Sequence, residues 1–562
     1  MRHTSLGDIQ MNFRSIVTVV VFGAAVSACG SGDINISPAT STVDNSVSNV
    51  GGNNPDDVCA SYQNSGGQTI QGSFDGTNCT YSPAFADAGN NLTTDLTIPA
   101  LANGGAHIFE GSLFVGETYD TDAALQSAGI AAGGDGPVLT VEAGATLAWQ
   151  GSSDFLIVNR GSQLFAVGSS DAPITFTSVS DVNGTVGPED VQQWGGMVIN
   201  GFGITNKCAY TGSVAGGDLA TTDCHVDAEG AAGLDESQYG GDNNDDSSGR
   251  LEYVVVKHTG ATVGNGDELN GISFGAVGRN TVVENLQVYS TYDDGIEMFG
   301  GAVNFTNFVA LYVRDDAIDV DEGWSGTITN ALVIQSETDG NHCIEADGIG
   351  SFDSLTAPEV EAVIAQGINS RPTINNLTCI ISPNGAATAT HDPGAGWRFR
   401  EGLFPTINDA LLIGSFSQAD ATSTNDNYCL RIDNRSQQAA QDGDLVMNSV
   451  IVACEEPTRG QTFPDGTTTE ESFAIAGGNI FATVTGTTDA TTAADTDLQL
   501  LEGAPPVYSI SYAAMNVDGA IPAGAPQSGA YIGALSLGDI DWTADWTYGI
   551  HPDNRAQALW FE

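Results

Sequence analysis

Carboxylates recur at a fixed spacing in the middle of this 562-residue chain and could together hold a metal ion. Asp294 is followed 22 residues later by Asp316, and Glu297 is followed at the same interval by Asp319. If this interval is one coil of a stacked structure, the paired side chains lie about 4.8 Å apart. Like charges at that distance repel unless they are protonated or bridged by a cation. Ca²⁺, which takes about six to eight oxygen ligands, is the cation that we expect.

Two clusters are predicted to bind calcium. The first surrounds DDAIDVDEG at 315–323, where Asp319 and Asp321 share one face of an expected strand. The second is DNNDDSSG at 242–249, which lacks the Gly and the distal Glu of an EF-hand. The alternative for both is a solvated acidic loop. The predicted metal ligands are Asp315, Asp316, Asp319, Asp321, Glu322, Glu297, Asp242, Asn244 and Asp246.

Catalysis on an acidic polysaccharide would need further groups. A lyase needs a basic residue beside the calcium, and the candidates are Arg314, which is next to Asp315, and Arg398 and Arg400 in GWRFREG. A glycoside hydrolase needs paired carboxylates, which Asp293 and Asp294 could supply. However, the Gly-His-Gly and Arg-x-Lys motifs of polygalacturonase-like hydrolases are missing, and arginines in so acidic a chain are commonly structural ion pairs. We therefore expect a non-catalytic protein that binds calcium and a ligand or polymer, with a calcium-dependent polysaccharide lyase or glycoside hydrolase as the alternative.

The composition excludes one class of partner. The chain has 70 Asp and Glu against 15 Lys and Arg, a formal net charge of −55. Nucleic acid binding requires clusters of cationic side chains, so we expect no nucleic acid partner. Hydrophobic residues make up 41% of the chain, which is enough for a folded core.

The elements that position these residues are short strands with Gly, Asn and Asp between them, and the pattern predicts an all-β fold. An Asn or Asp returns before successive apolar strands, because Asn tolerates left-handed backbone angles and can bond its neighbours in a stack. A third copy of the repeat is expected to begin at Asn330 and to place Asp339 in line with Asp316. We therefore predict a right-handed parallel β-helix with loop insertions rather than a sandwich or a propeller. The corner residues are Asn285, Asn307, Asn330, Asn376, Asp409 and Asn448.

The chain is predicted to have five parts. The β-helix occupies 104–500, with inserted loops at 215–250, 349–370 and 457–470. Trp542, Trp546 and Tyr548 are expected to cap the open end of the solenoid, with a sugar-stacking platform as the alternative. The other parts are a lipoprotein signal peptide at 1–28, a flexible tether at 29–58, a disulfide-closed segment at 59–103 and a C-terminal cap at 501–562.

The cysteines indicate export. The apolar run that starts at Ile16 ends in Val26-Ser27-Ala28-Cys29, which is like a lipobox, so Cys29 is the predicted site of lipid attachment. The remaining eight cysteines form an even number in four sequential, well-separated pairs, which favours disulfides in an exported chain. The predicted pairs are Cys59–Cys79, Cys208–Cys224, Cys343–Cys379 and Cys429–Cys454.

Several motifs of the chain occur together: WGGMVINGFG at 194–203, YGGDNNDDSSGRLEYV at 239–254, DDGIEMFGGAVN at 293–304, DDAIDVDEGWSG at 315–326, GAYIGA and DWTADWT. As a set they resemble a family of β-helix lipoproteins and secreted surface proteins of Gram-negative bacteria. The resemblance covers about 135–548 and implies a fold and a cellular location but no reaction. By analogy, Gly30 after the lipobox implies the outer membrane, and the implied partners are a lipid anchor in that membrane and a polysaccharide or an outer-membrane transporter.

Overall fold

The structure is a computed structural model. The predicted signal peptide and all but the last residue of the predicted tether, including Cys29, lie outside the residues that it describes. Among the helices of the described part, none has the length and apolar character needed to cross a membrane. The described residues are 58–87, 89–130, 134–229, 237–262, 268–382, 393–414, 428–454, 456–482, 510–511, 531–535 and 540–561.

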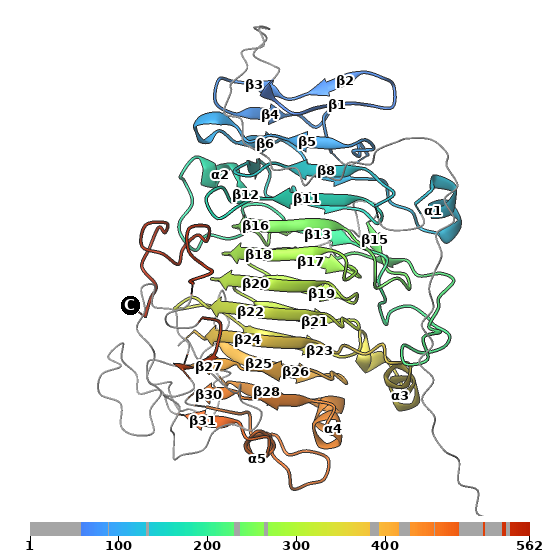
Figure 1. Cartoon of the computed structure of the whole chain (residues 1–562), viewed down its shortest axis with the longest axis vertical. Helices are drawn as coiled ribbons and strands as arrows, with labels where there is room; N and C mark the ends of the chain where they lie inside the picture. The colour runs from blue at the N-terminus through green and yellow to red at the C-terminus, as the bar shows by residue number, and fades with distance from the viewer. Residues whose placement is uncertain are drawn as a thin grey trace, which may run out of the picture. The chain divides into compact units, whose positions relative to one another are not determined.

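Nine short strands stack into one parallel sheet, each strand contributed by a different coil of the chain (Figure 1). All of their pairings are parallel, as expected of a β-helix. Residues that occupy the same place in successive coils therefore form rows across the sheet. The strands are β7 (Leu113–Val115), β10 (Leu156–Val158), β13 (Met197–Asn200), β17 (Ile272–Gly275), β19 (Ile296–Phe299), β21 (Ile318–Asp321), β23 (His342–Asp347), β25 (Ala395–Arg400) and β28 (Leu430–Ile432).

Each central coil also contains one longer strand, and these five longer strands pair with one another in parallel. Each bends at one residue of positive φ, between 52° and 60°, and this bend is a corner of the coil. Toward each end of the stack, a coil has two shorter strands in place of one long strand. These two strands pair with the two halves of the long strand in the neighbouring coil. The long strands are β16 (Gly249–Lys257), β18 (Val282–Tyr289), β20 (Asn304–Leu311), β22 (Thr327–Ile334) and β24 (Thr373–Ile380).

Most of the remaining strands continue the stack at both ends, whereas the first two strands of the chain pair only with each other, in antiparallel fashion. In the N-terminal part, β4 pairs with β6 in parallel, so the stack already begins inside the predicted segment 59–103. The N-terminal strands are β1 (Ser61–Gln63), β2 (Thr69–Gln71), β3 (Ser73–Phe74), β4 (Cys79–Tyr81), β5 (Leu96–Ile98), β6 (His107–Phe109), β8 (Val138–Val141), β9 (Thr146–Trp149), β11 (Gln163–Val167) and β12 (Ile174–Ser178). Near the C-terminal end they are β26 (Thr406–Asn408), β27 (Leu411–Ile413), β29 (Val446–Asn448), β30 (Ile451–Ala453) and β31 (Ile480–Ala482).

Asparagines line the predicted corner and bond one another along the stack. The side-chain amide of Asn307 donates to Asn285 at 2.9 Å, Asn330 donates to Asn307 at 2.9 Å, and Asn376 donates to Asn330 at 3.0 Å. The prediction of Asn448 at this corner is wrong, because Ser449 has the positive φ of 56°. Asn448 lies one residue earlier and donates to Asn408 in a parallel row.

These observations confirm an all-β architecture of parallel sheets, while the right-handed sense of the coils stays a prediction. The interior is one continuous apolar core that runs from Cys59 to Ala474. The four predicted disulfides are confirmed: Cys59–Cys79, Cys208–Cys224, Cys343–Cys379 and Cys429–Cys454.

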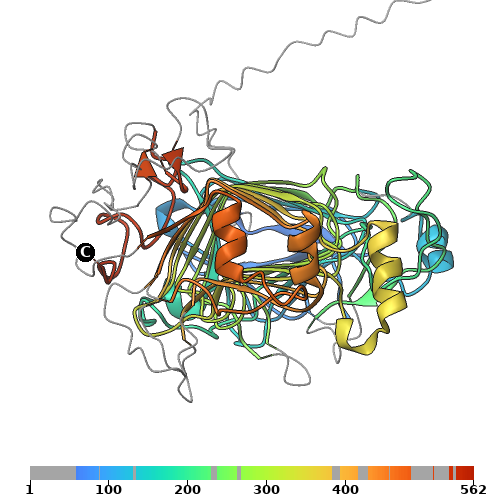
Figure 2. The same cartoon turned by 90° about the horizontal axis from the view of Figure 1, so that it is seen from below.

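Helices and the C-terminal segment cover the stack differently from the prediction. Buried side chains of α4 and α5 belong to the main core, and the view from below shows both helices across the last coils (Figure 2). The helix α3 lies within the predicted loop insertion 349–370. The helices are α1 (Asp122–Ala128), α2 (Val179–Val182), α3 (Ala357–Gln366), α4 (Asn434–Asp442) and α5 (Glu470–Ala476).

The described C-terminal residues pack on the side of the stack rather than over its end. Ile532, Ile550 and Phe561 share a second apolar cluster with outward side chains of the long strands, such as Val309 and Leu332. The indole of Trp560 donates to the carbonyl of Gln335 at 2.9 Å. Because this layer covers the outer face of the long strands, both faces of those strands are apolar.

For Trp546, the alternative of a sugar-stacking platform is also not supported. Trp546 is buried and lies edge-on to Tyr253, so it offers no face on which a sugar could stack. The strands in this region are β32 (Ile510–Ser511) and β33 (Tyr531–Ile532), which pair in antiparallel fashion.

Candidate functional site

One row of outward side chains changes from acidic to basic along the nine-stranded sheet. Glu297 lies beside Asp319, and Asp319 beside Glu345, as the repeat predicted. The next two coils place Arg398 beside Glu345 and Arg431 beside Arg398. The register of the coils therefore builds a strip with three carboxylates at one end and two guanidinium groups at the other.

A second row lies at the turn before these strands and is held by backbone amides. The side chain of Asn270 accepts the N–H of Asp294 at 3.1 Å, and Asp294 accepts the N–H of Asp316 at 2.9 Å. Asp316 in turn accepts the N–H of His342 at 2.7 Å. The predicted place of Asp339 in this row is wrong: the third coil is longer, and His342 follows Asp316 after 26 residues.

The two rows bring five carboxylates together. Oxygens of Asp293, Asp294 and Asp315 lie within 4.8 Å of one another, and so do oxygens of Asp294, Glu297 and Asp319. Asp294 belongs to both groups, so the two groups form one continuous cluster. The side-chain amide of Asn270 donates to Glu297 at 2.6 Å and to Glu229 at 3.2 Å.

Burial and mutual repulsion act on this cluster together. Burial and then the neighbouring carboxylates raise the pKa of Asp293 to about 8. The same two causes raise the pKa of Asp294, Glu297 and Asp319 well above the ordinary range. Such a cluster is stable near neutral pH only if it holds protons or a cation. Its all-oxygen ligand set fits Ca²⁺.

The cluster lines a cavity of about 520 Å³, which we call the acidic cleft. The same cavity is also lined by His342, Arg398, Tyr428 and Arg431, which belong to later coils of the stack. Of the groups predicted for catalysis, Asp293, Asp294 and Arg398 line this cavity. Arg400 does not line it.

Both predicted catalytic arginines are ion-paired. Arg398 donates to Glu345 at 2.8 Å and Arg400 donates to the other oxygen of Glu345 at 2.9 Å. Arg400 also pairs with Asp347, its neighbour in the register. Glu345 therefore joins the two guanidinium groups, and Arg398 alone also faces the cavity.

Three groups on the basic side of the acidic cleft form a hydrogen-bonded chain that sequence reasoning missed. Nδ1 of His342 lies 2.8 Å from Oδ1 of Asp316, and Nε2 lies 2.8 Å from the hydroxyl of Tyr428. Burial lowers the pKa of His342 to about 4. Burial also raises the pKa of Tyr428 to about 12, against the opposite effect of nearby arginines. The sequence contained one signal for this chain. His342 stands two residues before Ile344-Glu345, which continues the acidic row, so a place next to the acidic residues could have been predicted for it.

Two residues predicted as part of the first metal site have other partners. Asp321 belongs to the next outward row, where its side chain accepts the N–H of Glu322 at 2.6 Å. Glu322 accepts the hydroxyl hydrogens of Tyr239 at 2.6 Å and Thr205 at 2.9 Å. The predicted set 315–322 is therefore divided: Asp315 and Asp319 join the cluster, Asp316 binds His342, and Asp321 and Glu322 lie elsewhere.

The second predicted calcium site serves the backbone. Asn244 accepts the N–H of Ile204 at 2.8 Å, and Asp246 accepts the N–H of Phe202 at 2.9 Å. Asp242 accepts the N–H of Thr221 at 3.3 Å. These three side chains hold an inserted loop against the stack, and this role explains the density of Asn and Asp at 242–246.

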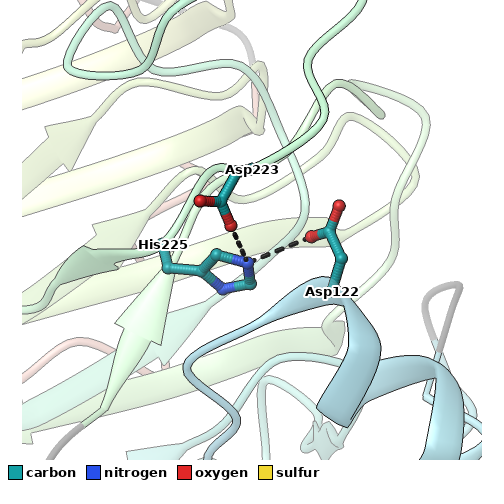
Figure 3. Close-up of side chains that lie close together, drawn as sticks. All are labelled: Asp122, Asp223 and His225. Carbon is teal, nitrogen blue, oxygen red and sulfur yellow. Dashed lines mark hydrogen bonds and ion pairs between the residues drawn. The ribbon is translucent and has the colours of Figure 1, made fainter.

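A further group with metal-ligand geometry lies outside the acidic cleft. Asp122, Asp223 and His225, which we call the His225 cluster, meet at the start of α1 (Figure 3). Nε2 of His225 lies 3.0 Å from Asp122 and 3.3 Å from Asp223. Its Nδ1 lies 2.7 Å from Nη2 of Arg160. Because a guanidinium can only donate, Nδ1 is an acceptor and the hydrogen of a neutral ring is on Nε2.

Comparison with known proteins gives one match. A family model described as a pectate-lyase like beta helix domain matches residues 116–497, which is more than half of the chain and includes every residue of the acidic cleft. A search of curated proteins and a search of solved structures found no match. The matched region contains the nine-stranded sheet from β10 to β28 and the long strands beside it. The chain therefore belongs to the family of pectate-lyase-like β-helix domains.

Proposed function

We propose that the acidic cleft binds an acidic polysaccharide through a bound calcium ion. The observation that carries this proposal is the strip of outward side chains that runs from Glu297 and Asp319 through Glu345 to Arg398 and Arg431. A polymer with a carboxylate on each sugar could engage both ends of the strip at once. The family match is compatible with a polysaccharide as the ligand.

At the acidic end, the cation supplies the attraction. A polyanion would be repelled by Asp293, Asp294 and Asp319 in their ionised forms. These side chains would hold Ca²⁺, which would neutralise them and could also bind the oxygens of a sugar carboxylate. The ligands that we assign are Asp293, Asp294, Glu297, Asp315 and Asp319.

At the basic end, the arginines supply recognition. A guanidinium binds a carboxylate through two parallel hydrogen bonds, which a lysine cannot do. Arg398 uses Nη1 for Glu345 and Nε for Asp433 at 3.4 Å. Its other terminal nitrogen has no hydrogen bond or ion pair to the residues that the structure describes. Arg398 can therefore contact a ligand in the cavity while its stem is held in place.

Binding of polygalacturonate and of alginate to the purified protein tests the proposal. We expect retention of both polymers with calcium and release with a chelator, and no retention of an uncharged glucan. Glu297→Gln and Asp319→Asn should each weaken calcium-dependent binding at least about tenfold, because each removes a charged ligand. Asp227→Asn, an exposed change outside the cleft, is the matched control. Binding that is the same with and without calcium would reject the proposal.

Elimination is a second candidate function, and a hydrolase is disfavoured. Hydrolysis by two carboxylates requires one on each side of the glycosidic bond. Asp293 and Asp294 instead belong to one cluster, with oxygens within 4.8 Å of each other and of Asp315. The chain from Asp316 through His342 to Tyr428 also lines the cavity and could transfer a proton, which favours a lyase.

We also propose that the protein is a lipoprotein of the cell surface, anchored through Cys29. The support is the lipobox-like sequence before this residue. An outer-membrane transporter would then be a suitable partner to receive the captured polymer. Metabolic labelling with a fatty acid should mark the wild-type protein and not Cys29→Ala, and equal labelling of both would reject the anchor.

A further inference from the structure

We propose that Tyr428 is a catalytic residue that transfers a proton in β-elimination of a uronate-containing polysaccharide, with His342 and Asp316 as positioning residues. This inference rests on the proposed function, because the polymer must first bind in the acidic cleft. It goes beyond binding by assigning a reaction and the group that performs it.

The order of the hydrogen bonds carries the assignment. Oδ1 of Asp316 accepts the backbone N–H of His342 at 2.7 Å and lies 2.8 Å from Nδ1 of the same residue. An oxygen that already accepts from the backbone acts as an acceptor for Nδ1–H as well. Nε2 then has the lone pair, and it accepts the hydroxyl hydrogen of Tyr428 at 2.8 Å. The proton of the phenol therefore points at a base that a carboxylate orients.

The three groups are held without freedom to rearrange. Asp316, His342 and Tyr428 are all buried, yet His342 and Tyr428 line the cavity. Asp316 is fixed by the turn row, and His342 begins β23. A chain preorganised in this way loses little entropy when a proton moves along it.

Cations surround the phenol and would stabilise negative charge on its oxygen. The guanidinium of Arg459 lies 4.9 Å from the centre of the Tyr428 ring, and Arg398 and Arg431 line the same cavity as Tyr428. Arg431 and Arg398 each lower the pKa of Tyr428, whereas burial raises it more strongly. The phenol is therefore neutral at rest and becomes negative only as it gives its proton to His342. The charged and titratable groups that face this chain are Asp315, Asp316, Glu345, Arg398, Arg400, Arg431, Asp433 and Arg459.

The reaction then balances without an outside reagent. Arg398 would neutralise the sugar carboxylate together with the calcium that the cluster would hold, and this would make the hydrogen on the adjacent carbon C5 acidic. The oxygen of Tyr428 takes this hydrogen while its own proton moves to Nε2 of His342. The C5–H electron pair forms the C4=C5 double bond, and the C4–O4 bond breaks. Tyr428 then donates a proton to O4, and His342 returns its proton to Tyr428.

Arg398 is the alternative base, and its contacts argue against that role. Its guanidinium donates to Glu345 at 2.8 Å, which stabilises the charged form. A base must be able to give up its proton before it accepts another. Arg398 is therefore better suited to neutralise the substrate carboxylate than to remove a proton.

The test measures the ultraviolet absorbance of the unsaturated product from polygalacturonate and from alginate in the presence of calcium chloride. We expect turnover of at least one polymer by the wild-type chain. Tyr428→Phe should lower kcat about 100-fold or more with little change in KM, because it removes a general acid-base group but no binding contact. Tyr62→Phe is the matched control, because it also removes one buried hydroxyl hydrogen bond, to Phe85 in the N-terminal segment.

His342→Gln separates positioning from packing. Without the imidazole, the proton of Tyr428 must leave to water. The remaining activity should therefore begin to rise at a higher pH than the activity of the wild type does. A purely structural role of His342 would lower activity without moving the pH profile. Calcium-dependent binding of both polymers is measured for each variant, so a variant that fails to fold is recognised by loss of binding.

The outcomes distinguish this inference from the proposed function. Calcium-dependent binding without any turnover by the wild type overturns the inference and leaves the binding function standing. Turnover by Tyr428→Phe at the wild-type kcat also overturns it. Absence of calcium-dependent binding overturns both.

Discussion

The acidic cleft and the His225 cluster both place three or more ligand atoms within 4.8 Å, but the partners of those atoms differ. In the acidic cleft, carboxylates face one another, and burial raises their pKa values. In the His225 cluster, each carboxylate faces an imidazole nitrogen that already bears a hydrogen, and both aspartates are more than half exposed. In the second set an N–H therefore lies between the carboxylates, whereas in the first set the carboxylates face one another directly.

The difference shows that proximity of ligand atoms is insufficient to identify a metal site. A metal needs the lone pair of the histidine nitrogen, and Nε2 can offer it only if Nδ1 takes the hydrogen. Arg160 prevents this, because its Nη2 lies 2.7 Å from Nδ1. Carboxylates have no such restriction, since every oxygen keeps lone pairs after accepting one backbone N–H.

Loss of Arg160, which contacts the His225 cluster, should lower the free energy of unfolding more than any other change predicted below. Arg160 is buried and donates to the carbonyls of Tyr119, Cys224 and Gly240 at 2.7–3.0 Å. Arg160→Met leaves these acceptors unsatisfied, so we expect the free energy of unfolding to fall by about 3 kcal/mol or more. Denaturant titration measures this change.

The same variant also tests the role assigned to Arg160. Once Nδ1 is released, Nε2 can bind a metal, so added Zn²⁺ should stabilise Arg160→Met and not the wild type. Arg279→Met, at an exposed arginine paired with Asp245, is the control and should change stability by less than about 1 kcal/mol. A wild-type chain that Zn²⁺ stabilises through His225 would break the comparison.

Calcium should have the next largest effect, and only through the acidic cleft. At about one hundred times its dissociation constant, a ligand stabilises the folded state by about 2.7 kcal/mol, which is a shift of a few degrees in Tm. Thermal unfolding with calcium and with a chelator measures this. Asp319→Asn should remove most of the shift, and in the chelator it should unfold at a higher temperature than the wild type, because it deletes a repelling buried charge. Equal melting curves in calcium and in chelator would contradict the assignment.

The calcium effect should depend on pH with a sign set by the raised pKa values. In a chelator, the folded chain binds more protons than the unfolded chain between the ordinary value of 3.8 and the pKa of about 8 for Asp293. Stability of the metal-free protein should therefore fall as pH rises through this range. If calcium displaces one proton, each pH unit below about 8 should reduce its stabilisation by about 1.4 kcal/mol. Tm measured in calcium and in chelator at pH 6, 7 and 8 provides the check.

The fold and half of the acidic cleft could be predicted because they depend on regular intervals. Asn285 and Asn307 mark a corner in each coil because Asn accepts positive φ, and the distance between them gives the coil length. That length places Glu297 beside Asp319 without knowledge of any other contact. The prediction for Asp339 also relied on a constant coil length, and it was wrong because this coil is four residues longer than the 22-residue repeat. His342 therefore occupies the place predicted for Asp339.

The other half of the site depends on insertions, whose paths spacing cannot describe. Tyr428 and Arg431 lie at β28, which a long stretch of sequence separates from β27, and Glu229 lies in the long interval between β13 and β16. Arg431 reaches the cleft because β28 takes the next place in the sheet register. His225 meets Asp122 across 103 residues, through a loop and a helix that do not belong to any repeat.

The smallest effect is expected from the aspartates of the His225 cluster. Asp223 is 77% exposed at its side chain and lies 3.3 Å from His225, while Asp122 lies closer to the same nitrogen. Asp223→Asn should change the free energy of unfolding by less than about 1 kcal/mol, because exposed ion pairs contribute little and Asp122 keeps the hydrogen of Nε2 bonded. Calcium should shift its Tm as it shifts that of the wild type, in contrast to Asp319→Asn. A loss of calcium response in Asp223→Asn would mean that the two clusters are coupled. The different hydrogen-bond partners of their ligand atoms would then not distinguish them.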